Sequence, residues 1–381
     1  MRPFSLLCGV AAGLLVACTD GDITGVSEPT DHASDASMLA ASRLSVMTRN
    51  LYVGAPLEPI LAETDHDAIP VRAAEAWAVL MATDFPTRAK AFAAEIDHVR
   101  PHLIGLQEVS LIRVQTPSDI VFGNLAPNAA DTALDFLGIL LGELDALGLD
   151  YRAVAINENI DVEIPRFDPT ATPIPLTDTR LTDYDVVLAR GDVAVTNPGS
   201  GTYQVALPAP AGFDVHRGWV GVDATVGDMV VRFVSTHLES DVEAIQLAQA
   251  QELIQLLAAE TRPIVVVGDF NSGPGRNQVQ SYESMQAAGY GDAWTARPGS
   301  REAGNTCCHA GDLSNAFPDM RERIDLVFTR NIERLSPASG KPVIMAWTVG
   351  DRAQDRKRFG IWPSDHAGVV ARFVFANIGK D

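Results

Sequence analysis

The sequence has few basic residues, few cysteines and no long hydrophobic run after its N-terminus. Lysine and arginine number 29 against 49 aspartate and glutamate residues, which leaves a net charge of −20. DNA binding depends mainly on basic side chains that neutralise phosphates, so a chain this acidic is a poor non-specific nucleic-acid binder. No later apolar run is long enough to span a bilayer, and we expect no membrane-spanning helix.

The shortage of cysteine limits the metal chemistry that the chain can support. Cys8 and Cys18 lie near the N-terminus, whereas Cys307 and Cys308 are adjacent to each other. The adjacent pair could form a vicinal disulfide, remain as free thiols, or bind a soft metal together with His309. Two cysteines and one histidine without a second spaced pair make a poor zinc site.

The N-terminus has the pattern of a processing signal rather than of a folded element. Arg2 precedes an apolar stretch from Phe4 to Val16, and residues 15–18 resemble a lipoprotein box. We therefore expect residues 1–17 to be a signal peptide and Cys18 to carry a lipid. The chain would be exported and anchored to a bacterial membrane, in the periplasm or at the cell surface. It would be secreted if Cys18 is not acylated.

The rest of the chain is predicted to be a tether followed by one domain. Residues 18–42 are small and polar, which is typical of a flexible tether. Residues 43–377 show no second change of composition and no internal repeat, so we expect a single domain. The segment near 157–182 contains four prolines, which argue against regular structure. We predict an irregular insertion there, acting as a lid or a substrate-selecting loop.

Hydrophobic patterning predicts a domain rich in strands, with intervening helices. Helices are predicted from Arg72 to Val99 with a break at Pro86, from Thr132 to Leu147, and from Asp241 to Glu260. The run Ile264–Val267 is wholly apolar, as expected of a strand buried on both faces. The other predicted strands are Leu44–Thr48, Leu103–Leu106, Tyr151–Ile156, Val186–Ala189, Trp219–Val226, Met229–Ser235, Asp325–Thr329, Val343–Trp347 and Val369–Phe375.

Six short polar motifs adjoin these predicted strands. They are Thr48-Arg49-Asn50, Gln107-Glu108, Ser235-Thr236-His237, Gly268-Asp269-Phe270-Asn271, Arg323-Ile324-Asp325 and Ser364-Asp365-His366. Polar residues at strand ends are where sheets of this kind place their chemistry. Carboxylates, amides and histidines at such positions are suited to binding a hard divalent cation and hydrolysing a phosphate ester.

The order of these motifs resembles the endonuclease/exonuclease/phosphatase superfamily, which includes deoxyribonucleases, sphingomyelinases and inositol-polyphosphate 5-phosphatases. The resemblance extends from about Leu44 to Phe375. It implies an α+β fold of four layers, α/β/β/α, in which two mixed sheets pack face to face between helices. It also implies Mg²⁺ as the cofactor, with Mn²⁺ or Ca²⁺ as alternatives.

The resemblance implies a set of metal ligands. Glu108 would bind the metal, with Asn50 beside it and Asp365 reaching the same region. Many relatives have an acidic residue two positions after this asparagine, whereas this chain has Tyr52. The difference puts a second metal position in doubt, although a Mg²⁺ site often needs only one or two carboxylates.

The resemblance also implies catalytic roles. Asp269 would orient or deprotonate the attacking water, and Asn271 would donate to a non-bridging phosphate oxygen. His366 would act as a general base or stabilise the transition state, with its ring held by Asp325. His237 would hydrogen-bond the phosphate or protonate the leaving oxygen.

Other polar residues are weaker candidates. The partner of His237 could be Asp183 or Asp185. Arg217 and the basic cluster Arg352–Arg358 could reach a phosphate, but structural or solvent-exposed roles compete with this interpretation. The remaining histidines are expected to be structural or on the surface: His32, His66, His98, His102, His216 and His309.

Together these features predict an exported, monomeric, metal-dependent phosphoesterase that hydrolyses a phosphodiester by in-line attack of water. The substrate could be a phospholipid, a nucleic acid or a small phosphate ester. A lipid phosphodiesterase fits the anchor, the acidity and His237, but no exposed aromatic hairpin can be identified in the sequence. An extracellular nuclease, a sugar or inositol phosphate phosphomonoesterase, and a non-catalytic binding protein remain as alternatives.

Overall fold

The structure is a computed structural model that describes residues 42–275, 279–299, 302–335 and 340–375. The predicted signal peptide, Cys18 and nearly all of the predicted tether lie outside the described residues. Among the helices that are described, none is both long and apolar enough to cross a membrane.

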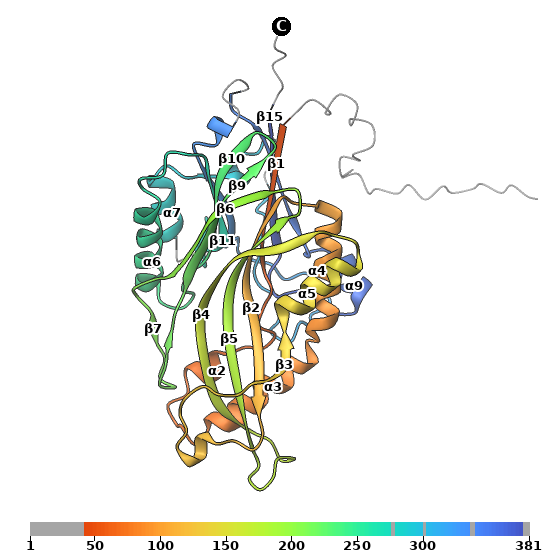
Figure 1. The fold of residues 1–381 in the computed structure, drawn as a ribbon, viewed down its shortest axis with the longest axis vertical. Helices are drawn as coiled ribbons and strands as arrows, with labels where there is room; N and C mark the ends of the chain where they lie inside the picture. The colour runs from red at the N-terminus through yellow and green to blue at the C-terminus, as the bar shows by residue number, and fades with distance from the viewer. Residues whose placement is uncertain (1–41, 276–278, 300–301, 336–339, 376–381) are drawn as a thin grey trace, which may run out of the picture. The chain divides into compact units, whose positions relative to one another are not determined.

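Two mixed β-sheets form the centre of the domain (Figure 1). The first sheet has the strand order β14-β15-β1-β2-β5-β4, with β3 paired to β2. Its strands are β1 (Ser42–Asn50), β2 (Leu103–Gln115), β3 (Asp131–Asp135), β4 (Tyr151–Phe167), β5 (Leu176–Arg190), β14 (Val343–Val349) and β15 (Gly368–Phe375).

The second sheet has the strand order β12-β13-β11-β10-β9-β6. Its strands are β6 (Ala194–Thr202), β9 (Gly218–Val226), β10 (Met229–His237), β11 (Ile264–Asp269), β12 (Gly291–Asp292) and β13 (Asp325–Arg330). A separate short pair joins β7 (Leu207–Pro208) to β8 (Asp214–Val215). Each of the strands predicted from the hydrophobic pattern lies within a strand of one of the two sheets.

Helices cover the outer faces of both sheets (Figure 1). α6 and α7 lie beside the second sheet, and α4 and α5 lie beside the first. The helices are α2 (Glu58–Leu61), α3 (Ile69–Ala82), α4 (Phe85–Val99), α5 (Phe136–Ala146), α6 (Glu243–Leu256), α7 (Gln280–Ala287), α8 (Ala293–Ala296) and α9 (Ala353–Phe359), with 3₁₀ turns at Ile120–Phe122 and Ile332–Leu335.

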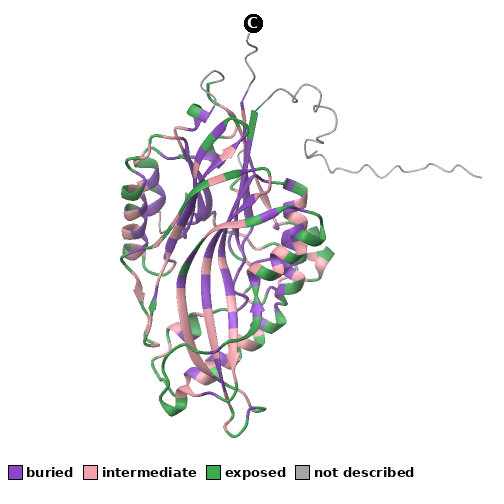
Figure 2. Cartoon of the chain, in the orientation of Figure 1, coloured by how far each residue is buried: buried purple, intermediate pink, exposed green. Residues whose placement is uncertain are grey.

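Three hydrophobic interfaces hold these layers together. Val265 and Val267 of β11 face the first sheet in the inter-sheet core, whereas Ile264 and Val266 pack under α6 and α7. Since successive strand residues point to opposite faces, the wholly apolar run of β11 is buried on both sides. A third cluster packs α4 and α5 onto the first sheet. Figure 2 shows buried residues along both sheets and exposed residues on the outer helical faces. The predicted four-layer α/β/β/α sandwich is confirmed.

The two sheets approach each other closely near the polar motifs. A Cβ atom added at Gly105 of β2 would lie 2.5 Å from the side chain of Val267, so this contact requires glycine. Two residues further along β2, the Gln107 amide accepts from Thr48 at 3.1 Å and donates to Ser235 Oγ at 2.8 Å. This link joins both sheets directly below the motifs.

The structure corrects the prediction of an irregular segment near 157–182. These residues instead form most of a long antiparallel hairpin made of β4 and β5. Pro165 lies within β4, the edge strand of its sheet, where a residue without an N–H is tolerated. The other three prolines fall in or beside the connection at 168–175. Thr132–Asp135, predicted as the start of a helix, belong to β3, and the helix begins at Phe136.

Candidate active site

The sheet topology brings the six motifs to one edge of the sandwich. β1 and β2 are parallel, as are β10 and β11, so Asn50, Glu108, His237 and Asp269 lie near the same ends. β13 and β15 run antiparallel to these strands. The motifs that precede β13 and β15 therefore lie at the same edge, although they come before their strands rather than after them.

A cavity of about 600 Å³ opens at this edge. Its lining includes predicted residues from both sheets: Glu108, His237, Asp269, Asn271, Asp365 and His366. Asn50 and Asp325 lie directly behind the lining, in hydrogen-bond contact with Glu108 and His366 respectively. The structure thus brings together all eight residues that the sequence marked as metal ligands or catalytic groups.

His366 and Asp325 form a buried pair. His366 Nδ1 lies 2.8 Å from Asp325 Oδ2, and the side chain of Asp325 is 0% exposed. Burial alone would lower the pKa of His366, but the carboxylates of Asp325, Asp365 and Asp269 together raise it well above its ordinary value. The pair orients the ring so that Nε2 lies 3.8 Å from Asp269 Oδ2. This arrangement suits a histidine that holds a proton and faces the reacting group.

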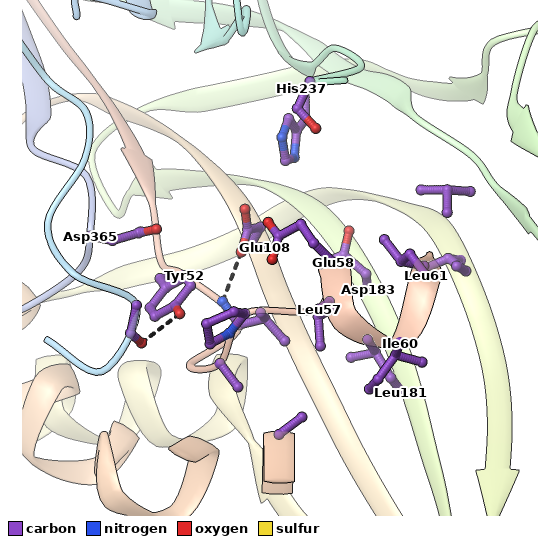
Figure 3. A pocket seen from close by; sticks show the side chains of 18 of the residues that line it. Tyr52, Leu57, Glu58, Ile60, Leu61, Glu108, Leu181, Asp183, His237 and Asp365 are labelled. Atoms are coloured by element: carbon purple, nitrogen blue, oxygen red, sulfur yellow. Dashed lines mark hydrogen bonds between the residues drawn. The ribbon is translucent and has the colours of Figure 1, made fainter. Parts of the chain in front are cut away.

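Glu108 is aimed into the cavity by a β-bulge. The register of β2 against β5 shifts between Leu106 and Val109, and Glu108 has a φ of 55°. Bulges are common beside active sites because they redirect a side chain. The Glu108 carboxylate then accepts from Asn50 Nδ2 at 2.9 Å. It also accepts from the Val53 N–H at 2.8 Å (Figure 3).

Asn50 holds two carboxylates at once. Its amide nitrogen lies 2.9 Å from Glu108 Oε1 and 3.2 Å from Asp269 Oδ2. Its oxygen accepts from the N–H of Tyr52 at 2.8 Å. The structure therefore places Asn50 as a donor that positions the acidic groups, while the metal-binding role inferred from the sequence stays a prediction.

The acidic groups of the cavity fit a hard divalent cation. Burial, together with the Glu108 carboxylate, raises the pKa of Asp365 to about 7 despite the opposing effect of His366. Burial also raises the pKa of Asp269 to about 6. Asp325 Oδ1 is buried without a hydrogen-bond partner. Desolvated carboxylates that face one another are costly unless a cation neutralises them, and carboxylate oxygens are the donors that Mg²⁺, Mn²⁺ and Ca²⁺ accept.

A second group of possible ligands overlaps the first. Donor atoms of Asp269, Asp325 and His366 lie within 4.8 Å of one another. The nitrogen of His366 that faces Asp325 is already hydrogen-bonded. Glu108 and Asp365 line the same cavity, and their role as metal ligands stays a prediction. Acidic and histidine groups that could hold a metal ion are therefore present at the predicted edge.

The vicinal cysteines form a disulfide at the rim of the cavity. Cys307 and Cys308 are bonded to each other, and both line the cavity. Cys308 Sγ lies 4.0 Å from His366 Nε2. A disulfide sulfur is not the thiolate that a soft metal requires, so the structure favours the disulfide over the metal-binding and free-thiol alternatives.

His237 contacts an arginine and not an aspartate of β5. Arg217 Nη1 lies 3.0 Å from His237 Nδ1, while His237 Nε2 lies 3.6 Å from Asp269 Oδ2. Burial, then the charges of Arg217 and His366, lower the pKa of His237 well below its ordinary value. The suggested pairing of His237 with Asp183 or Asp185 is wrong, since the partners of His237 are Arg217, Asn271 and Asp269. Asp183 accepts instead from Asn159 at 3.1 Å.

Sequence reasoning undervalued several residues of the cavity. Arg217, His216 and His309 all line it, as does Asp183, whose pKa burial and Glu108 raise to about 7. The signal for Arg217 was present in the predicted strands Trp219–Val226 and Met229–Ser235, which pair antiparallel as β9 and β10. Gly218 pairs with His237 in the register of that hairpin, which places the preceding arginine beside the histidine.

The other weak candidates lie elsewhere. The basic cluster Arg352–Arg358 spans α9 and is absent from the described cavity lining. His66 and His98 are exposed, whereas His102 is buried and accepts from the N–H of Ser45 at 3.0 Å. His32 lies outside the described residues.

Comparison with known proteins identifies the family. The sequence model of the endonuclease/exonuclease/phosphatase family matches residues 79–366, about three quarters of the chain. The chain belongs to this family. All of the predicted metal-binding and catalytic residues except Asn50 fall within the matched range. Members are hydrolases that act on phosphate esters, so a phosphoesterase-type function follows for this chain.

Solved structures of the same family have the same fold. A family protein from Leptotrichia buccalis is 13% identical at a TM-score of 0.51, covering 87% of this chain and 99% of its own. A second, from Bacteroides vulgatus, is 14% identical at a TM-score of 0.50, covering 88% of this chain and 100% of its own. No curated protein sequence matches the chain.

Proposed function

We propose that this chain is an exported, Mg²⁺-dependent phosphodiesterase that cleaves its substrate by in-line attack of water. The single observation that carries the proposal is the buried Asp325–His366 pair, which faces Asp269 across the same cavity edge as Glu108 and Asp365. A fixed histidine, a carboxylate for the water and a separate acidic pair for a cation are the parts that this hydrolysis needs.

Glu108 and Asp365 would hold the cation, with Asn50 positioning the carboxylates. When bound, the cation supplies positive charge against the phosphoryl oxygens. Mn²⁺ or Ca²⁺ would accept the same oxygen donors, so the donor set alone does not select Mg²⁺.

Four side chains of the protein would carry out the remaining catalytic roles. Asp269, which faces both histidines, would orient the attacking water or accept its proton. His366 would hold positive charge near the phosphoryl group. His237 would donate to a phosphoryl or leaving oxygen through Nε2, because Nδ1 is engaged by Arg217. Asn271, whose amide nitrogen donates to the Leu238 carbonyl at 2.9 Å and lies 3.3 Å from His237 Nε2, would donate to a non-bridging oxygen of the bound phosphate.

The charges around the cavity favour a diester over a monoester. A phosphomonoester carries more negative charge than a diester and would require additional cations. Among the described residues of the cavity lining, Arg217 is the one arginine, and that lining contains no lysine. The net charge of −20 also disfavours a polyanionic nucleic acid. These observations support a phosphodiesterase over the monoesterase and nuclease alternatives.

The proposed location rests on the sequence. Residues 1–17 would be removed as a signal peptide and Cys18 would carry a lipid that holds the enzyme on a bacterial membrane. Metabolic labelling with an alkyne fatty acid tests this directly. Labelling that disappears in Cys18→Ser supports the anchor, and equal labelling of both proteins contradicts it.

Hydrolysis of bis-p-nitrophenyl phosphate and p-nitrophenyl phosphate tests the activity. The purified protein is assayed with Mg²⁺ and with EDTA, beside His366→Ala. We expect metal-dependent cleavage of the diester that is lost in the variant. Cleavage of the monoester alone would instead indicate a phosphatase, and full activity of His366→Ala would contradict the proposed mechanism.

A further inference from the structure

The cavity continues from its polar end into an apolar groove. The groove is formed by Leu57, Ile60 and Leu61 at α2 and by Ile160, Val162 and Leu181 of the β4–β5 hairpin. Figure 3 shows Leu57, Ile60, Leu61 and Leu181 on one side of Glu108 and Asp183, with His237 on the other. The groove therefore opens directly beside the residues proposed to bind the phosphate.

The alternation of side chains along β5 connects the polar end of the cavity to the apolar groove. Thr179, Leu181 and Asp183 alternate along β5 and all three line the cavity, so they share one face of the strand. Four residues of strand span roughly 13 Å. A linear group attached to a phosphate beside Asp183 could follow this face without leaving the groove.

The groove side chains are not fully packed by the protein itself. Ile160, Val162 and Leu181 remain half-buried. A strand neighbour on the opposite face, by contrast, has hydrogen-bond partners within the protein. Asp161 accepts from Arg180 Nε at 2.7 Å and from Thr182 Oγ1 at 2.8 Å. An amphipathic hairpin whose apolar face stays partly open beside a catalytic cavity is the arrangement expected of a ligand site.

The groove fits an aliphatic chain better than a nucleobase. Most of its side chains are branched aliphatic and offer no donors or acceptors to a base edge, and an unpaired polar edge is costly to bury. Glu58 and Thr179 are the polar side chains that line the groove beside them. Trp77, which also lines the cavity, could stack a base, but Arg166 already lies 4.3 Å from its ring centroid.

We propose that this groove binds an alkyl or acyl chain of the substrate, so that the phosphodiester cleaved is an amphiphile. The inference rests on the proposed function, since it assumes that the phosphate lies among Glu108, His237 and Asp365. It adds the substrate class: a phosphate ester of a lipid-like molecule, with its apolar chain along the β4–β5 hairpin.

A chain-length series tests the groove. The purified protein is assayed on p-nitrophenyl methyl, butyl and octyl phosphates, which share one leaving group and one charge. We expect kcat/KM to rise with chain length, by up to about fourfold for each methylene removed from water. Equal kcat/KM for the methyl and octyl esters would overturn the proposal while leaving the phosphodiesterase intact.

Two isoleucines of β4 provide a matched pair of variants. Ile160 lines the groove, whereas Ile156 is 45% exposed and lies outside the described cavity lining. Ile160→Asn is expected to flatten the dependence of kcat/KM on chain length, and Ile156→Asn to retain it. If kcat/KM lost its dependence on chain length in both variants, the loss would come from disturbance of β4 rather than from the groove.

A binding measurement separates this inference from the proposed function. Calorimetric titration with methyl, butyl and octyl esters of methylphosphonic acid requires no turnover. We expect affinity to rise with chain length, with a negative heat-capacity change that marks apolar burial. Chain-dependent binding without hydrolysis of any diester would support the groove and contradict the phosphodiesterase. Affinity that does not change with chain length would overturn the groove.

Discussion

The guanidinium of Arg217 lies 3.0 Å from Nδ1 of His237, inside the candidate active site. Arginine is always a donor, so Nδ1 accepts and, in the neutral ring, the proton resides on Nε2. That nitrogen lies 3.6 Å from Asp269 Oδ2 and 3.3 Å from the amide nitrogen of Asn271. A carboxylate in the place of Arg217 would favour the opposite tautomer and a positive charge. In this chain, therefore, His237 is held as a neutral donor and His366 as the charged histidine.

Replacing Arg217 tests this division of roles. In Arg217→Leu the constraint on Nδ1 is lost, so ¹⁵N NMR of labelled histidine should change from one tautomer to a mixture. We expect kcat/KM on a diester to fall about tenfold to a hundredfold, the usual effect of removing a group that orients a catalytic ligand. Arg358→Leu, the same change at an exposed position of α9, is the control. An unchanged His237 spectrum in Arg217→Leu would refute the role.

The Asp325–His366 pair predicts a loss of rate without a loss of fold. Asp325→Asn keeps the size of the side chain but removes the charge that holds the ring of His366. We expect kcat to fall about a hundredfold or more, because the ring loses its orientation and its stabilised charge. Circular dichroism and thermal unfolding should show that the folded structure is retained. A variant with near-normal kcat would show that the pair is structural.

Metal binding should be visible as stabilisation, independently of turnover. A cation that binds only the folded protein at 100 times its Kd adds about 2.7 kcal/mol to the free energy of unfolding. We expect Mg²⁺ to raise the Tm of the unaltered protein and EDTA to reverse the shift. In Glu108→Gln the Mg²⁺-induced shift should disappear.

A matched variant tests whether Mg²⁺ stabilises the protein by binding at Glu108 or at another acidic group. The described residues contain a separate acidic group, formed by Asp119, Glu163 and Asp178. Glu163→Gln should therefore retain the Mg²⁺-induced shift that Glu108→Gln loses. The reverse result would place the stabilising ion at the second group and remove the support for Glu108 as a ligand.

His102 predicts a stability that depends on pH. It is 6% exposed, and burial lowers its pKa from 6.5 to about 4. Because the unfolded chain then binds the extra proton more readily, stability falls as the pH falls from 6.5 to 4. The loss attributable to this residue is about 3 kcal/mol at most.

Denaturant unfolding at a series of pH values checks this slope. His102→Gln keeps an acceptor for the Ser45 N–H but has no titrating ring, so its unfolding free energy should depend less on pH between 4 and 6.5. His66→Gln, at an exposed position, should retain the slope of the unaltered protein. Parallel slopes in all three proteins would exclude His102 as the source.

Local sequence patterns determined the strands and the candidate site residues. Alternating or continuous apolar runs predict strands because burial repeats with the geometry of the backbone, and β11 shows both faces buried as its composition required. The polar motifs adjoin those strands, and the resemblance to the family implied the two sheets that bring them to one edge.

Only the tertiary structure decided the features that depend on neighbours distant in sequence. The prolines near 165–175 predicted a break, yet β4 accommodates Pro165 because it is an edge strand, a property that no local pattern states. The register of β9 against β10 placed Arg217 beside His237. The apolar groove exists because α2 and the β4–β5 hairpin approach without closing on each other. Such contacts join segments that are distant in sequence, so no local sequence pattern predicts them.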